Sequence, residues 1–96
     1  MAKTIWKYQI PFGRGSVNFE LELPKGATCR AVREMPGGRD EACMWFEVDA
    51  EAPKEKRQFE IVGTGNPIGH KIGTHLGSVF MGDLPFVFHI YEVIMP

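Results

Sequence analysis

Short runs rich in Val, Ile, Phe, Tyr and Trp follow one another along the whole chain, separated by clusters of Gly and Pro. Such runs between turn residues are typical of strands, and no stretch keeps apolar residues at helical spacing for three turns. The pattern predicts an all-β fold, a single small domain of about seven mostly antiparallel strands, sandwich or barrel-like, with little or no helix. The expected strands cover residues 3–10, 17–23, 28–35, 42–49, 56–63, 72–80 and 86–94.

The segment 17–23 shows the clearest alternation of apolar and polar residues. Strict alternation indicates a strand with one core face and one solvent face. Pro24 follows and ends this strand, because proline cannot donate a hydrogen bond to the ladder. A helical turn around residues 53–56 is the one helical element that the sequence allows.

The segment 86–93 is instead apolar on both faces. A half-solvated sheet does not require such a strand, so something must cover its outer face. A second copy of the chain is one cover, and we therefore expect a homo-oligomer. The alternative is a closed small barrel or sandwich that takes up these side chains itself.

With 96 residues, of which 44% are hydrophobic, the chain is expected to form one β-rich domain over residues 1–96. Its formal net charge of −1 argues against a strongly basic nucleic-acid binder, so no nucleic-acid partner is expected. No signal peptide and no membrane-spanning apolar run is present, so we expect no membrane association. Cys29 and Cys43 lie in strand-like runs and are predicted to be buried free thiols, as suits a reducing cytoplasm.

The glycine-rich segment 63–75 is the most unusual part of the chain. Closely spaced glycines let backbone N–H groups converge on an anion, and Thr64, Asn66 and Lys71 offer further polar contacts. The glycine spacing does not fit a Rossmann or P-loop signature. The alternative is a long connection between strands in which Asn66 and Pro67 start a turn.

Aromatic side chains are abundant for a core of this size, and the tryptophans Trp6 and Trp45 stand out among them. An exposed tryptophan close to an arginine such as Arg57 can stack a purine and hold its phosphate. The alternative is that these rings form the core and an oligomer seam.

Residue patterns for catalysis or metal binding are absent from the sequence. No Cys-x-x-Cys or His-x-x-x-His pair occurs, so no metal is expected. Ser16 and Ser78 lack a nucleophile elbow, and both cysteines are expected to be inert. His89 lies between two apolar neighbours and is expected to be hydrogen-bonded and partly buried. We therefore expect no cofactor and no enzymatic activity.

Six segments together form a recognisable combination: Thr4-Ile5-Trp6-Lys7-Tyr8, Leu23-Pro24-Lys25-Gly26-Ala27, Met44-Trp45-Phe46-Glu47-Val48-Asp49, Phe59-Glu60-Ile61-Val62-Gly63-Thr64-Gly65-Asn66-Pro67-Ile68, Ile72-Gly73-Thr74 and Val87-Phe88-His89-Ile90-Tyr91-Glu92. In this combination the chain resembles a family of short, mostly uncharacterised bacteriophage proteins of about the same length. The resemblance covers nearly the whole chain. It implies expression in an infected bacterium, hence location in the host cytoplasm.

These observations lead to a non-enzymatic small-molecule binding protein of a bacteriophage as the main hypothesis. Its ligand is expected to be nucleotide-like, a sequestered immune signal of the host, so that the protein acts as an anti-defence sponge. The alternative is a protein-interaction module that inhibits or redirects a host protein complex. The expected ligand-binding residues are Gly63, Thr64, Gly65, Asn66, Trp45, Arg57, Trp6 and Lys71.

Overall fold

Seven antiparallel strands make up the part of the chain that the structure describes, as the sequence predicts. The computed structural model describes residues 2–11, 18–35, 42–69, 72–81 and 86–94, and those residues contain no helix. The helical turn that the sequence allows around residues 53–56 does not form, because the fifth strand already begins at Lys54. The strands are β1 Lys3–Ile10, β2 Asn18–Pro24, β3 Thr28–Glu34, β4 Ala42–Asp49, β5 Lys54–Gly63, β6 Ile72–Met81 and β7 Phe86–Val93.

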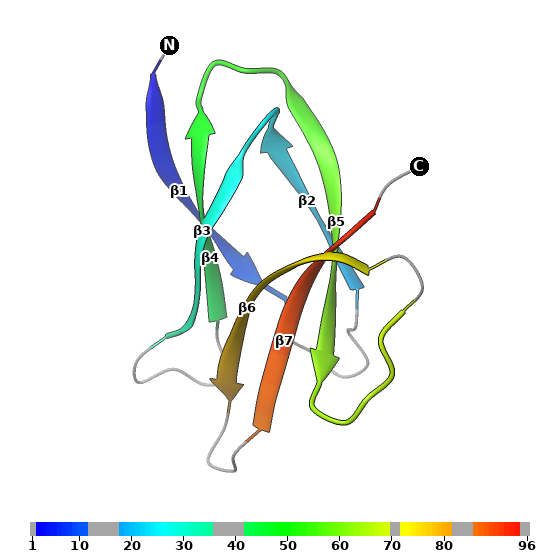
Figure 1. Cartoon of the computed structure of the whole chain (residues 1–96). Helices are drawn as coiled ribbons and strands as arrows, with labels where there is room; N and C mark the ends of the chain where they lie inside the picture. The colour runs from blue at the N-terminus through cyan, green and yellow to red at the C-terminus, as the bar shows by residue number, and fades with distance from the viewer. Residues whose placement is uncertain (1, 12–17, 36–41, 70–71, 82–85, 95–96) are drawn as a thin grey trace.

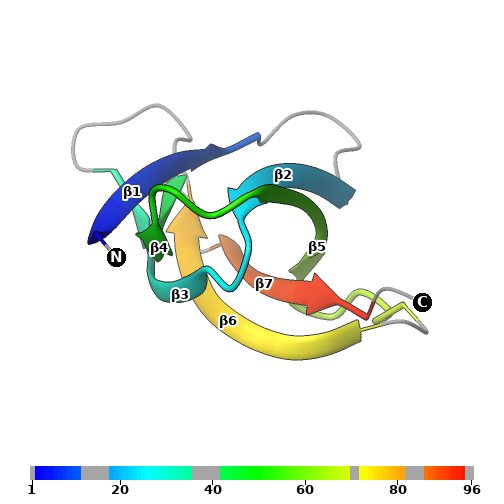
Figure 2. The same ribbon diagram turned by 90° about the horizontal axis from the view of Figure 1, so that it is seen from above.

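The strands form two sheets that face each other (Figure 1). The first sheet has the order β1-β4-β3, and the second has the order β2-β5-β7-β6. Seen from above, the second sheet curves round so that β6 comes back beside β3 (Figure 2). At this junction the backbone N–H of Phe80 on β6 donates to the carboxylate of Glu34 on β3, at 3.4 Å. The result is a sandwich that is partly closed like a barrel.

The core lies between the sheets and is built from alternate residues of the strands. Phe46 of β4 and Phe59 of β5 are fully buried and meet edge to face, with ring centroids 6.1 Å apart. Phe19 of β2 stacks on Phe59 at 5.2 Å. The remaining buried apolar side chains surround these three rings, because alternation sends every second side chain of each strand inward. They include Ile10, Leu23, Val32, Met44, Val48, Ile61, Val79 and Ile90.

The strand β7, expected to be apolar on both faces, is only partly covered by the domain itself. On its inner face Ile90 is buried, and Phe88 packs against the core. On its outer face Val87, His89 and Tyr91 are half-buried. Oligomer formation therefore stays a prediction. No helix of the described residues is long and apolar enough to cross a membrane.

The cysteines are free thiols, as predicted. Cys43 is buried, whereas Cys29 is half-buried and its thiol donates to the backbone oxygen of Ala31 at 3.7 Å. Burial raises the pKa of the Cys29 thiol above its ordinary value. A raised pKa keeps the thiol protonated, and the thiolate is the reactive form.

We expect the native protein to react with a thiol-specific reagent at neutral pH on the order of tenfold more slowly than the unfolded chain. The raised pKa of Cys29 also predicts how the stability of the protein changes with pH. The stability contributed by the neutral Cys29 thiol is complete below the pKa of the unfolded chain and is lost as pH rises through the folded pKa. Ellman's reagent with and without denaturant measures the labelling rates, and a Cys29→Ser variant separates the two thiols. Equal rates in the folded and unfolded protein would contradict the burial.

Candidate functional site

The turn that follows β5 explains one glycine of the glycine-rich segment, Gly65. The backbone N–H of Asn66 donates to the carbonyl of Gly63 at 3.0 Å, and Gly65 has a φ of +89°. A glycine with positive φ at the third position is what a type II turn requires. The backbone N–H of Thr64 donates to Val87 of β7 at 3.2 Å, which ties the turn to the second sheet. The predicted turn therefore exists, but it closes at Asn66 rather than starting there.

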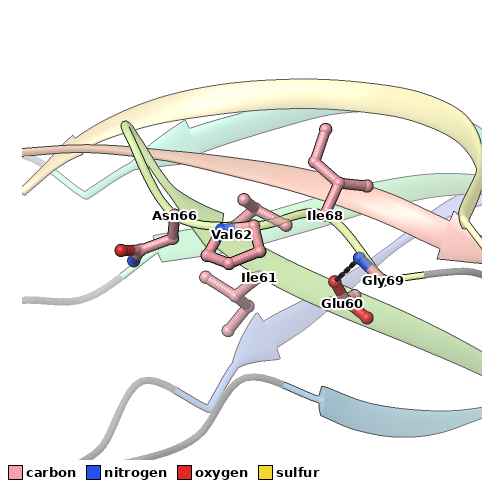
Figure 3. A pocket seen from close by; sticks show the side chains of 7 residues that line it. Glu60, Ile61, Val62, Asn66, Ile68 and Gly69 are labelled. Atoms are coloured by element: carbon pink, nitrogen blue, oxygen red, sulfur yellow. Dashed lines mark hydrogen bonds between the residues drawn. The ribbon is translucent and has the colours of Figure 1, made fainter.

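Residues 64–69 run back along β5 and leave an open recess of about 500 Å³ between loop and strand. Gly69 holds the far end of the loop by donating its backbone N–H to Oε2 of Glu60, at 3.1 Å (Figure 3). The other carboxylate oxygen of Glu60 accepts no hydrogen bond from the described residues. The lining combines apolar side chains with one carboxylate and one carboxamide, and consists of Glu60, Ile61, Val62, Asn66, Pro67, Ile68 and Gly69.

The two predicted base-stacking tryptophans lie away from this recess. Trp6 pairs across the ladder with Phe46, which places it on the inner face of the first sheet, where it packs against the core. Trp45 is half-buried on the outer face of the same sheet, opposite Lys7. Gly63 ends β5 of the second sheet and residues 64–66 form the turn after it, so one chain does not bring either tryptophan to them.

Arg57, predicted to hold the charge of a ligand, is committed to an internal contact. Its side chain points to the inner face of the second sheet, where Nε and one terminal nitrogen each donate to the carboxylate of Glu92 at 2.7 Å. The other terminal nitrogen donates to the carbonyl of Ala27 at 2.6 Å, and the guanidinium lies 5.8 Å from the centre of the Phe46 ring. The hydrogen bonds to Glu92 raise the pKa of Arg57. Lys71 lies outside the described residues.

A cluster that the sequence did not predict occupies the outer face of the second sheet. His89 of β7 lies opposite Ser78 of β6, and Thr64 and His75 complete a connected set of polar side chains. The position of His75 depends on two irregularities in the β6–β7 register, between residues 72 and 77, whereas Ser78 lies in the regular stretch that follows them. Glycines at positions 73 and 77 accompany the irregularities, but the sequence does not indicate which strand pairs with β6. His89 was expected to be hydrogen-bonded and partly buried, and the structure adds its partner, Ser78.

On the outer face of the first sheet, charges compensate one another at one end. Glu47 lies 3.6 Å from the ammonium of Lys3 and 2.9 Å from the guanidinium of Arg30. The hydrogen bond from Arg30 lowers the pKa of Glu47, although the carboxylate is exposed. These contacts hold surface charges in place and leave the recess beside β5 as the better candidate for a ligand site.

The family model described as "Domain of unknown function (DUF7352)" matches residues 1–96. No curated protein and no solved structure matches the chain.

Proposed function

We infer that this chain, which belongs to the DUF7352 family, is a non-enzymatic binding protein for a nucleotide-type small molecule. The site is the recess between β5 and residues 64–69. The observation that carries the inference is its lining, in which apolar surface surrounds one carboxylate, Glu60, and one carboxamide, Asn66. Sites for small molecules are typically apolar walls with a few polar groups that orient the ligand.

The polar groups match the parts of a nucleoside. A carboxamide such as that of Asn66 both donates and accepts, which is the pattern on the edge of a purine. A carboxylate accepts hydrogen bonds from ribose hydroxyls, and Oε1 of Glu60 is available for this among the described contacts. Pro67 and Ile68 offer apolar surface to the plane of the base. Because Glu60 repels phosphate, the phosphate is placed at the other end, near the backbone of Gly65.

The biological role follows from the kind of site proposed and from the sequence resemblance to short bacteriophage proteins. A protein that removes a signal molecule by binding it must bind tightly and does not need to catalyse a reaction. We propose that the chain sequesters a nucleotide-type immune signal in the host cytoplasm and that it acts as a homo-oligomer. Size-exclusion chromatography with light scattering reports the number of copies in solution.

Calorimetry with adenosine, AMP, ADP-ribose and cyclic dinucleotides tests the ligand class, and we expect at least one of these to bind. Asn66→Ala should weaken that binding by about tenfold or more, the effect of losing about 1.4 kcal/mol. Glu60→Gln should weaken binding of the ribose form but not of its 2′-deoxy counterpart, while the new amide oxygen still accepts from Gly69. Gln58→Ala, an exposed side chain two residues away on β5 and outside the recess, should leave affinity unchanged. If no ligand gives a heat of binding or raises the melting temperature, the proposed function is wrong, and the protein-interaction module is favoured.

A further inference from the structure

Four polar side chains on the outer face of the second sheet form one continuous chain of hydrogen bonds. The hydroxyl of Ser78 lies 2.7 Å from Nδ1 of His89 and 3.2 Å from Nε2 of His75. On the other side of the His89 ring, Nε2 lies 3.0 Å from the hydroxyl of Thr64, which donates to the backbone oxygen of Val87 at 3.3 Å. The two imidazoles therefore approach the same atom, the Ser78 oxygen, from two strands.

The direction of these hydrogen bonds is fixed by the carbonyl at one end. The Val87 oxygen can only accept, so the Thr64 hydroxyl donates to it. The Thr64 oxygen then accepts from His89, which places the ring proton on Nε2. The lone pair of His89 is consequently on Nδ1, where it accepts from Ser78. Nδ1 of His89 thus presents its lone pair toward the Ser78 hydroxyl. Because Ser78 gives its one proton to His89, its oxygen accepts from Nε2–H of His75. To ligate a metal through Nε2, His75 must move that proton to Nδ1 and give up its contact with Ser78.

We propose that this face binds a divalent transition-metal ion of the zinc, copper or nickel class through Nδ1 of His89 and Nε2 of His75. Neutral imidazole is the preferred ligand of these ions. The described residues hold no group of three or more His, Cys, Asp and Glu arranged around a metal. The site is therefore a two-imidazole one, whose other coordination positions are open to water or to an added ligand.

The contact between Thr64 and His89 is a second observation that supports a metal site. A histidine that ligates a metal almost always donates its other ring N–H to a fixed acceptor, which sets the tautomer and the ring orientation. Here the acceptor is the Thr64 hydroxyl, itself fixed by Val87. His75 is exposed, and its ring meets the edge of Tyr91 with centroids 5.1 Å apart. Its ring centroid is 6.2 Å from that of His89, and because zinc–nitrogen bonds are about 2.0–2.1 Å long, His75 must swing closer to share the ion.

This site is independent of the proposed nucleotide function, since the metal alone is the probe. Zinc titration of the tag-free protein, followed by calorimetry, should show one ion per chain. His75→Ala and His89→Gln should each weaken binding by about tenfold or more, and Thr64→Val should weaken it by about tenfold through the orientation of His89. His70→Ala, which removes the remaining histidine, is the control and should bind like the parent protein.

Nitrogen NMR of the imidazole rings checks the atoms involved. Zinc should shift the Nδ1 signal of His89 far more than its Nε2 signal, which stays protonated toward Thr64. Thermal unfolding of each variant shows that it is folded before its affinity is compared. Three outcomes would overturn the proposal: no zinc bound by the folded parent protein, full affinity in folded His89→Gln, or loss of binding in His70→Ala alone.

Discussion

Replacing Arg57 by methionine should lower the free energy of unfolding by about 3 kcal/mol. The side chains of Arg57 and Glu92 are only 17% and 24% exposed, and two hydrogen bonds of 2.7 Å join them. The variant leaves the Glu92 carboxylate without its partner in a half-buried site, and the carbonyl of Ala27 loses its 2.6 Å contact as well. Removing one member of a buried pair typically costs about 3–5 kcal/mol, and partial exposure places this pair at the lower end. Urea unfolding followed by tryptophan fluorescence measures the change.

The protein contains a matched control for this substitution. Arg30 forms a comparable hydrogen-bonded pair with Glu47 on the outer face of the first sheet, but the Arg30 side chain is 54% exposed. Exposed ion pairs contribute about 1 kcal/mol at most, so Arg30→Met should have a small effect. Changing Arg57 and Glu92 to methionine together should recover part of the loss, because no unpaired charge remains. If Arg57→Met costs no more than Arg30→Met, the internal pair does not stabilise the domain.

The fold was predictable because its determinants are local. Alternation in residues 17–23 corresponds to β2, where Phe19 and Leu23 are buried and Glu20 and Glu22 are exposed. Glycine and proline clusters separate the strands, and each predicted strand is present with its ends shifted by at most two residues. The alternation of apolar and polar residues does not show which strands pair with one another. The sequence gives no signal that β7 lies between β5 and β6, although this order decides which side chains meet.

The candidate site was predictable only in part, because most of its contacts depend on which strands pair. The loop at residues 63–66 is identified by its glycines, and one of them, Gly65, is needed locally because the turn places it at positive φ. Arg57 was expected to face a ligand, yet its partner Glu92 is 35 residues away in the chain and becomes a neighbour only through the β5–β7 ladder. Trp6 and Trp45 look alike in the sequence, but they lie in different strands of the first sheet, so that one faces the core and the other the outside. Ser78 meets His89 because β6 pairs with β7, and His75 joins them only through irregular pairing before Gly77.

Gly77→Ala should destabilise the domain by about 1–3 kcal/mol, because it adds a methyl group where β6 closes against β3. A Cβ at Gly77 would lie 2.9 Å from Cβ and 3.0 Å from Cγ2 of Val32. Val32 is 1% exposed and belongs to the core cluster, so it has no room to move aside. The new methyl must therefore push β6 away from β3 and loosen the junction that partly closes the barrel. The midpoint of urea unfolding measures the effect.

Two further variants test that explanation. Gly63→Ala places a Cβ at the same distance, 2.9 Å, from the side-chain nitrogen of Asn66. That nitrogen is at the end of an exposed side chain, which can rotate away, so this variant should cost clearly less than Gly77→Ala. Val32→Ala removes Cγ2, 3.0 Å from the added methyl, but keeps the Cβ at 2.9 Å, so it relieves the clash only in part. The double variant should therefore be more stable than the sum of the two single effects predicts, by about 0.5 kcal/mol. Strict additivity would mean that β6 can shift away from β3 without loss, and that the contact between Gly77 and Val32 does not determine how the two sheets close.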